Sequence, residues 1–209
     1  PQEKKRKISL QSSIIPIEYN DFKLNFIDSP GFFDFEGEVL QALRAAESAL
    51  FVIDGENGIE VATEKYWKYT QEINLPSIIY VNKLDKENAN FNKVVSDLHI
   101  QFGKKIIPLT LTLGEGENFE GIIDVIDKKA YTYENDEKKE VEIPEIRVAE
   151  VEEVYNQVIE AVAESDESLM EKFFEGEEFS EKEFRKGLSK AILEGDVIPV
   201  SYTHLRAHE

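Results

Sequence analysis

Two short polar motifs each follow an apolar run and carry residue types that can bind a nucleotide. An Asp-Ser-Pro-Gly motif at 28–31 follows residues 24–27, and an Asn-Lys-Leu-Asp motif at 82–85 follows residues 77–81. If both runs are strands of an open parallel sheet, the polar side chains lie at one edge of that sheet. The sequence therefore predicts a polar site that is built from two strand ends.

The first motif suits a metal-bound phosphate. A carboxylate at a strand end, such as Asp28, can hold Mg²⁺ through a water molecule. Gly31 follows Pro30 and has no Cβ, so its backbone N–H can approach a phosphate oxygen closely. The same residue types also form ordinary turns, so this motif is weak when it is taken alone.

The second motif suits a guanine base. The carboxylate of Asp85 can accept two N–H bonds from the guanine edge, and adenine lacks that pair of donors. The amide of Asn82 can reach the base, and the aliphatic stem of Lys83 can lie along the ring with its ammonium in water. A polar helix cap is the alternative for this motif alone. Together, the two motifs predict a GTPase fold that binds GTP and Mg²⁺.

Composition narrows the choice of partners. The chain has 209 residues, is 41% hydrophobic and carries a net charge of −19, with 43 acidic and 24 basic residues. Such an acidic surface argues against nonspecific binding to DNA or membranes, although a local basic patch could still contact RNA. There are no cysteines, so disulfides and thiolate metal sites are excluded. No apolar run reaches membrane-spanning length, and a cytoplasmic location is expected.

Strand and helix patterns alternate in residues 1–103 and predict an α/β fold with a doubly wound, mostly parallel sheet. The expected strands are 22–27, 49–53 and 77–81, preceded by short β-like stretches at 8–13 and 15–18. The expected helices are 36–47, 61–73 and 91–102, with Trp67 and Ile73 facing inward and Gly103 ending the last helix.

The pattern changes after Gly103 to consecutive strands and then helices, which predicts an α+β insert subdomain at 104–199. The expected strands are 106–113, 119–126, 129–133 and 139–143, and the expected helices are 147–164, 167–174 and 180–194. Valines at positions 151, 154, 158 and 162 form one helical stripe, which is more typical of a core than of a partner groove. Ser180 and Glu183 have the spacing of a capping box.

Residues 200–209 differ abruptly from the rest and resemble the translation of a sequencing adapter, so an adapter-derived tail is expected there. His204 and His208 have the i, i+4 spacing of a metal-binding pair, and the alternative is a library artefact. Pro1 stands where a complete reading frame would begin with Met, so we expect the natural chain to continue upstream.

The chain resembles the translation elongation factor G family of translational GTPases, and most of all its elongation factor G-like paralogues. Besides the two motifs, the resemblance rests on Asp54 and on residues 6–10, 34–39, 42–45, 58–61, 63–65, 88–91 and 114–121. It implies a P-loop-type GTPase domain that carries the family's insert. It also implies that Ser9 occupies the position of the switch-one threonine, whose hydroxyl binds Mg²⁺ beside Asp28.

One position departs from the family pattern. The family usually has a histidine after Asp-x-Pro-Gly, which positions the attacking water, and here that position is Phe32. A phenyl ring cannot hydrogen-bond water in that manner, so no residue is assigned as catalytic. Two functions remain open: a GTPase that hydrolyses GTP in protein synthesis, and a nucleotide-gated ribosome-binding protein with little or no hydrolysis. A third interpretation, a nonfunctional assembly artefact, is compatible with both.

Two expected parts of the GTP site are not in the sequence. The Gly-x-x-x-x-Gly-Lys-Ser/Thr phosphate loop is expected upstream of Pro1, and the Ser-Ala motif that backs the guanine is expected after Val200. This fragment alone is therefore expected to be inactive. For the full-length protein, the resemblance implies a monomer whose partner is the ribosome, including its stalk proteins.

Overall fold

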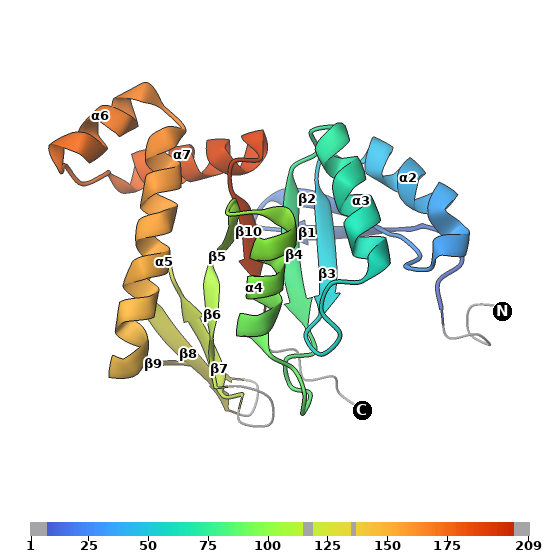
Figure 1. The fold of residues 1–209 in the computed structure, drawn as a ribbon, viewed down its shortest axis with the longest axis horizontal. Coiled ribbons are helices and arrows are strands. Elements are labelled where there is room, and N and C mark those ends of the chain that lie inside the picture. The colour runs from blue at the N-terminus through green and yellow to red at the C-terminus, as the bar shows by residue number, and fades with distance from the viewer. Residues whose placement is uncertain (1–7, 115–118, 135–136, 203–209) are drawn as a thin grey trace. The chain divides into compact units, whose positions relative to one another are not determined.

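The structure is a computed structural model that describes residues 8–114, 119–134 and 137–202 (Figure 1). The chain forms two compact units. The first unit contains residues up to 49 together with 61–75, and the second contains 50–60 together with 76 onward.

A β-hairpin opens the first unit. Strand β1 (Ser13–Tyr19) pairs antiparallel with β2 (Phe22–Asp28), and Ser13 lies opposite Asp28. The connecting residues Asn20 and Asp21 have φ values of 47° and 65°, as the tight two-residue turns of hairpins require. The predicted stretch at 8–13 was wrong for residues 8–12. The last residue of β2 is already opposite Ser13, so the described residues 8–12 lie beyond the end of that strand.

Three helical elements complete the first unit: η1 (Phe33–Phe35), α2 (Glu36–Ala45) and α3 (Val61–Glu72). Lys65 Nζ on α3 lies 2.6 Å from Glu36 Oε2 on α2, and Arg44 Nε donates to Tyr69 Oη over 2.8 Å. Trp67 is buried, as predicted. The prediction for Ile73 was wrong, because α3 ends at Glu72 and Ile73 is 37% exposed.

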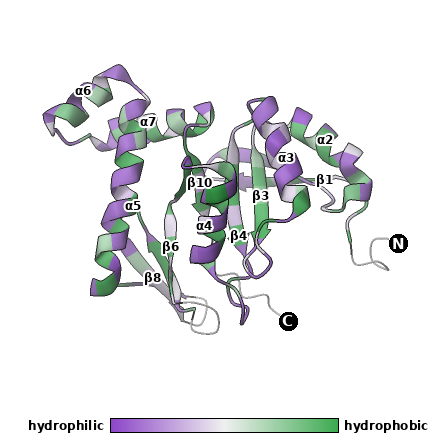
Figure 2. Ribbon diagram, viewed as in Figure 1, coloured by the Kyte–Doolittle hydropathy of each residue, from purple (hydrophilic) through white to green (hydrophobic). Residues whose placement is uncertain are grey.

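A four-stranded sheet forms the centre of the second unit. Its order is β3 (Ala49–Asp54), β4 (Ser77–Asn82), β10 (Ile198–Ser201) and β5 (Ile106–Pro108), and β10 runs parallel to both of its neighbours. Ile79, Val81 and Val200 are fully buried in it. Figure 2 shows that β3 is mainly hydrophobic. Ala49 and Ile53 of this strand are buried, whereas Leu50 and Val52 on its other face are exposed. Strand β10 is buried from Ile198 to Val200, as is typical of a central strand of a parallel sheet.

Helix α4 (Phe91–Phe102) follows β4 and keeps its predicted bounds. Its first turn is capped by the side chain of Asn90, which accepts a hydrogen bond from the backbone N–H of Lys93 over 2.7 Å. It ends at Gly103, whose φ of 92° favours glycine. Phe91 and Leu98 are buried, so the helix is held by its apolar face.

Two strands that were predicted to lie outside the first domain belong to this central sheet. Residues 104–199 were assigned to the insert and 200–209 to a tail, yet β5 and β10 both pair within the sheet of β3 and β4. Strand β10 extends to Ser201, and Tyr202 is buried behind it. No local signal marks a strand whose partners lie about a hundred residues away in the chain, because pairing at that distance is set by tertiary packing. The rest of the predicted tail, with His204 and His208, lies outside the described residues.

The insert contains an antiparallel meander of β6 (Thr110–Leu113), β7 (Gly121–Asp124), β8 (Lys129–Glu134) and β9 (Glu137–Val141). The single strand predicted at 106–113 is divided at Leu109 into β5 and β6, which lie in different sheets. The N–H of Leu109 donates to the carbonyl of Val200, and its carbonyl accepts the N–H of Val125. The chain therefore passes from one sheet to the other at this residue.

Three helices complete the insert: α5 (Glu145–Glu164), α6 (Glu167–Glu175) and α7 (Glu181–Glu194). All four valines of the predicted stripe on α5 are buried, which confirms that the stripe is core. The predicted α/β class with a parallel sheet and an α+β insert is also confirmed. Among the described residues, none of the helices has the length and apolar character needed to span a membrane.

The capping box at the start of α7 is present as predicted. Ser180 Oγ accepts the N–H of Glu183 over 3.3 Å, and Glu183 Oε2 accepts the N–H of Ser180 over 3.0 Å. Lys172 Nζ also donates to Glu183 Oε1 over 2.6 Å. The hydrogen bond from Lys172, followed by those from Ser180, lowers the pKa of Glu183 from 4.5 to about 2.

We predict that Glu183→Gln flattens the acid limb of the stability curve. Because the pKa of Glu183 is lowered in the folded state, its contribution is complete above its ordinary pKa and is lost as pH falls toward about 2. Urea unfolding at a series of pH values between these limits measures the slope. Glu181→Gln, which alters an exposed ion pair with Arg185 in the same turn, is the control. A variant that keeps the wild-type slope would contradict the assignment.

Candidate functional site

A backbone hydrogen bond joins the carboxyl ends of β3 and β4. β3 ends at Asp54 and β4 ends at Asn82, and the N–H of Gly55 donates to the carbonyl of Asn82 over 2.8 Å. The N–H of Asn90 in turn donates to the carbonyl of Gly55 over 3.1 Å. The loop at 54–58 is thus bonded to both ends of the loop at 82–90, and the two loops form one frame.

The second predicted motif, at 82–85, is a tight turn on this frame. Asn82 is half-buried, and its side-chain Oδ1 accepts the N–H of Lys83 over 2.9 Å. Lys83 has a φ of 59°, in the left-handed region. Leu84 is buried and anchors the turn, whereas Lys83 and Asp85 are exposed. The turn therefore presents its polar groups outward while an apolar side chain fixes it to the core.

The ammonium of Lys83 donates a hydrogen bond to the carboxylate of Asp54, and the sequence analysis did not predict this contact. Lys83 Nζ lies 2.6 Å from Asp54 Oδ2, and Asp54 Oδ1 accepts the N–H groups of Glu56 and Asn57 over 2.9 and 3.2 Å. The ammonium was expected in water, and although the side chain is 55% exposed it is tied to this carboxylate. The pair of an exposed lysine and a mostly covered aspartate fixes the end of a side chain that is otherwise flexible.

The contact between Asp54 and Lys83 shifts the pKa values of both side chains. Burial alone would raise the pKa of Asp54, but hydrogen bonds from Lys83, Glu56 and Asn57 outweigh it and lower the pKa below its ordinary value. The hydrogen bond to Asp54 raises the pKa of Lys83 above its ordinary value. Both shifts favour the charged forms, so the ion pair is complete throughout the neutral pH range.

Gly55 lets the two loops come close together. A Cβ at this position would lie 2.8 Å from Leu84 Cδ2 and 3.0 Å from the carbonyl oxygen of Asn82. Side chains larger than hydrogen would therefore push the motif away from β3. Sequence reasoning missed this role of Gly55, and the Asp-Gly pair at the end of a buried strand was the available signal.

The first predicted motif, at 28–31, lies in the first unit. Asp28 ends β2 and is exposed, and Pro30 is buried. A Cβ added at Gly31 would meet no described atom within 4 Å, so the backbone there faces open space. Ser9, which the resemblance assigned to Mg²⁺, is half-buried and precedes β1.

Phe32 begins the short helix that follows this motif. Its carbonyl accepts the N–H of Phe35 over 3.0 Å at the start of η1. Its side chain is 55% exposed. The neighbouring Phe33 instead lies beneath the ammonium of Lys65, with Nζ 5.4 Å from the ring centre. The ring of Phe32 is thus accessible directly after the motif at 28–31.

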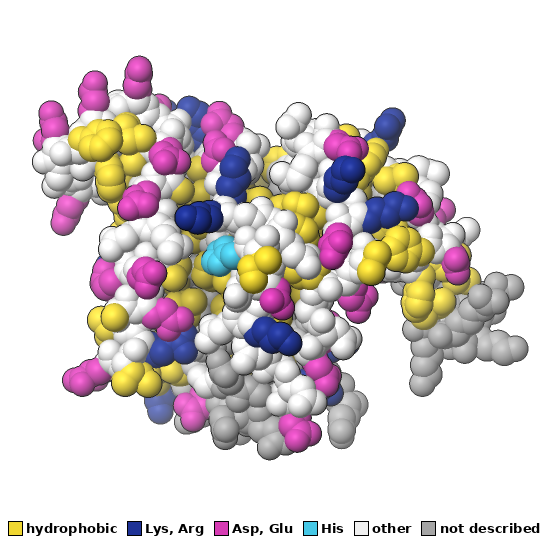
Figure 3. All heavy atoms as spheres, viewed as in Figure 1, with side chains coloured by type: hydrophobic (Ala, Val, Ile, Leu, Met, Phe, Trp, Pro, Cys, Tyr) yellow, Lys and Arg dark blue, Asp and Glu magenta, His cyan; other side chains and the backbone are white. Residues whose placement is uncertain are grey.

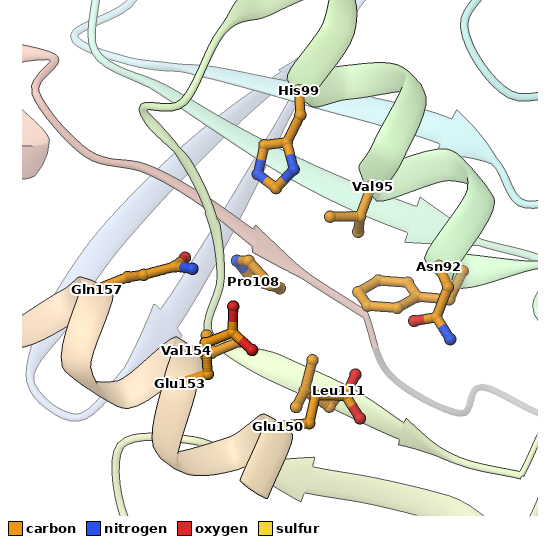
Figure 4. A pocket seen from close by; sticks show the side chains of 10 residues that line it. Asn92, Val95, His99, Pro108, Leu111, Glu150, Glu153, Val154 and Gln157 are labelled. Carbon is orange, nitrogen blue, oxygen red and sulfur yellow. The ribbon is translucent and has the colours of Figure 1, made fainter.

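A separate pocket lies in the second unit, between α4 and α5 (Figure 4). Its volume is about 190 Å³, which is below the range usual for ligand sites of about 300–1,000 Å³. Glu150 and Glu153 of α5 border it opposite His99 of α4. Two carboxylates would repel the phosphates of a nucleotide. Because it contains none of the predicted nucleotide-binding residues, we do not assign this pocket to the nucleotide.

The fold and the motif at 82–85 are typical of one class of protein: α/β domains that bind nucleotides outside the carboxyl ends of their sheet strands. Residues 1–202 match the family described as the elongation factor Tu GTP binding domain, and the chain belongs to that family. The chain is therefore the GTP-binding domain of a translational GTPase.

Two relatives agree with this assignment. An elongation factor G-like protein of Thermotoga maritima is 34% identical over 200 residues, which cover 96% of this chain and 29% of the relative. A crystal structure of a Thermus thermophilus protein superposes with a TM-score of 0.90 at 34% identity, over 97% of this chain and 30% of that one. These similarities confirm the predicted resemblance to the elongation factor G family. The chain spans less than a third of the length of either relative.

We predict that Gly55→Ala destabilises the frame of the two loops. The added Cβ meets Leu84 and the backbone of Asn82, and such overpacking typically costs about 1–3 kcal/mol. Urea unfolding measures the loss, and amide NMR shifts at 82–90 locate it. Gly37→Ala is the matched control, because its Cβ would meet no described atom within 4 Å and alanine stabilises a helix by about 0.5–1 kcal/mol. Equal effects of the two substitutions would contradict the close approach.

Proposed function

We propose that the longer protein containing this chain binds and hydrolyses GTP on the ribosome during protein synthesis. The motif at 82–85, held at the end of β4 with its polar groups outward, is the observation that carries this proposal. The family of GTP-binding domains and the similarity to an elongation factor G-like protein support it. Beyond the described domain, the proposal rests on these relatives.

Recognition of guanine is assigned to three residues of this motif. The exposed carboxylate of Asp85 accepts the two N–H groups of the guanine edge. The amide of Asn82, at the strand end, reaches the base and the neighbouring backbone. The aliphatic stem of Lys83 lies along the face of the base, since its ammonium is directed to Asp54.

The phosphates and Mg²⁺ are assigned to the first unit. Ser9 and Asp28 offer a hydroxyl and a carboxylate, and oxygen ligands of this kind suit Mg²⁺. Gly31 has no Cβ, and a Cβ built there would meet no described atom within 4 Å, so a phosphate could approach its backbone without a steric clash. These residues therefore fit the metal, with Asp28 acting through water. When bound, Mg²⁺ would neutralise charge on the phosphates.

The nucleotide-gated alternative rests on Phe32. An exposed phenyl ring stands where the family's histidine would orient the attacking water, and it can neither donate nor accept that hydrogen bond. Loss of one such polar group typically lowers kcat by about 100- to 1,000-fold. In this alternative, GTP serves as a switch ligand for ribosome binding, and hydrolysis is slow or absent.

The acidic helices of the insert favour a protein contact over an RNA contact on the ribosome. Figure 3 shows acidic side chains projecting over α6 and beside α5. Phosphate backbones would be repelled by such a surface, whereas a positively charged protein surface would be attracted. We assign this contact to the proteins of the ribosomal stalk. We further propose that the protein is a monomer and acts in the cytoplasm, where translation factors act.

We propose that the polypeptide of residues 1–209 is inactive by itself. Its sequence contains no Gly-x-x-x-x-Gly-Lys-Ser/Thr motif, so the backbone N–H groups that cradle the β- and γ-phosphates are missing. Phosphate contacts of that kind supply much of the binding of a nucleotide. Functional experiments therefore use the full-length protein.

Steady-state GTP hydrolysis by the full-length protein, with and without ribosomes, tests the proposed function. We expect ribosomes to stimulate turnover, and we expect Phe32→His to increase the stimulated kcat by up to about 100-fold because it restores a water-positioning group. Phe33→His is the control, since it places the same ring one residue later. Tight GTP binding without stimulated turnover would contradict hydrolysis and leave the nucleotide-gated alternative.

A further inference from the structure

We propose that Asp54 is a positioning residue for guanine recognition, which acts by holding Lys83 in its base-binding conformation. This inference rests on the proposed function, because it assumes that the motif at 82–85 receives a guanine nucleotide. It assigns a role to a residue outside that motif, at the end of the neighbouring strand β3.

The two carboxylate oxygens of Asp54 accept hydrogen bonds from different groups. Oδ1 accepts the N–H groups of Glu56 and Asn57 and closes the turn of its own loop. Oδ2 accepts the ammonium of Lys83 over 2.6 Å. The carboxylate is 18% exposed, so water competes weakly for it. Asp54 is thus fixed by its own loop before it binds the lysine, which is what a positioning group requires.

Lys83 needs such a partner. Its side chain is 55% exposed, and a free lysine side chain occupies many rotamers. A base that packs against the stem must select one of them, and the entropy lost in that selection weakens binding. Because Asp54 holds the ammonium, the stem is already ordered when the nucleotide arrives.

The same loop also fixes the backbone on which Lys83 lies. Gly55 is hydrogen-bonded to Asn82, the first residue of the motif, and to Asn90, which follows the motif, and Asn88 Nδ2 donates to Glu56 Oε1 over 3.1 Å. Lys83 has a positive φ, which a non-glycine residue adopts at a cost. The hydrogen bonds of the two loops and the ion pair with Asp54 offset that cost together.

A purely structural role for Asp54 makes different predictions. Asp54→Asn keeps an oxygen for the N–H groups of Glu56 and Asn57 but removes the charge that holds the ammonium. Lys83→Met keeps an apolar stem of similar length and removes the ammonium. If Asp54 acts through Lys83, the effect of Asp54→Asn disappears in the Lys83→Met background.

The experiment is a double-mutant cycle for GDP binding by the full-length protein, measured with a fluorescent GDP analogue at constant salt. We expect Asp54→Asn to raise the Kd for GDP about three- to fivefold, as for loss of a partly exposed ion pair, mainly through faster dissociation. In the Lys83→Met background the same substitution should change the Kd less than about twofold, on the order of the additivity error. Asp196→Asn, which removes the ion pair to Lys105 at 2.8 Å, is the matched control and should bind as wild type.

Each outcome has one meaning. A wild-type protein that does not bind GDP overturns the proposed function, and this inference with it. A wild-type protein that binds GDP, with unchanged binding by Asp54→Asn, overturns the inference alone. A loss of equal size in both backgrounds also overturns it, because Asp54 would then act only through the loop. A loss confined to the background with Lys83 supports it.

Discussion

The hydrogen bond from the N–H of Gly55 to the carbonyl of Asn82 joins the ends of β3 and β4, and the candidate site depends on that junction. At the end of a sheet, strand-to-strand bonding stops and backbone groups must find other partners. Here the two loops satisfy one another, so the chain that leaves β4 begins its turn in a fixed place. The polar groups of residues 82–85 are therefore positioned by main-chain bonding.

Burial holds this junction to the rest of the second unit. Ile53 and Val81 are buried just before the two strand ends, and Leu84 is buried within the motif itself. Apolar residues and polar residues thus alternate along a few positions of chain. The apolar ones fix the turn to the core, whereas the polar ones remain accessible, and this division allows a short loop to bind a ligand without losing its shape.

Sequence reasoning succeeded where the signal was local. The strand predicted at 77–81, the helix from Phe91 to Phe102 and the capping box at Ser180 are each specified by nearby residues, and the structure contains all three. The motif at 82–85 was found because its residue types follow a strand. Long-range features were missed. Strand β10 pairs with strands that lie far from it in the sequence. Strands β5 and β6 were predicted as one strand, but the chain passes from one sheet to the other at Leu109.

The same distinction applies within the candidate site. The ion pair of Asp54 with Lys83 and the close approach at Gly55 join loops that are well separated in sequence, so no spacing rule predicts them. The residue types of Asp54 and Gly55 were still informative, because an Asp-Gly pair after a buried strand is typical of a tight loop. The fold brings the loop at 54–58 next to the motif at 82–85, and this proximity makes the loop part of the candidate site.

The most direct test of this account is the base preference of an Asp85→Asn variant of the full-length protein. Guanine offers two donors to the carboxylate, whereas xanthine offers one donor and one acceptor, which match an amide. We predict that the variant loses affinity for GDP and gains affinity for xanthosine diphosphate, measured by competition against a fluorescent nucleotide. A variant whose preference for GDP over xanthosine diphosphate is unchanged would contradict the placement of the base at residues 82–85.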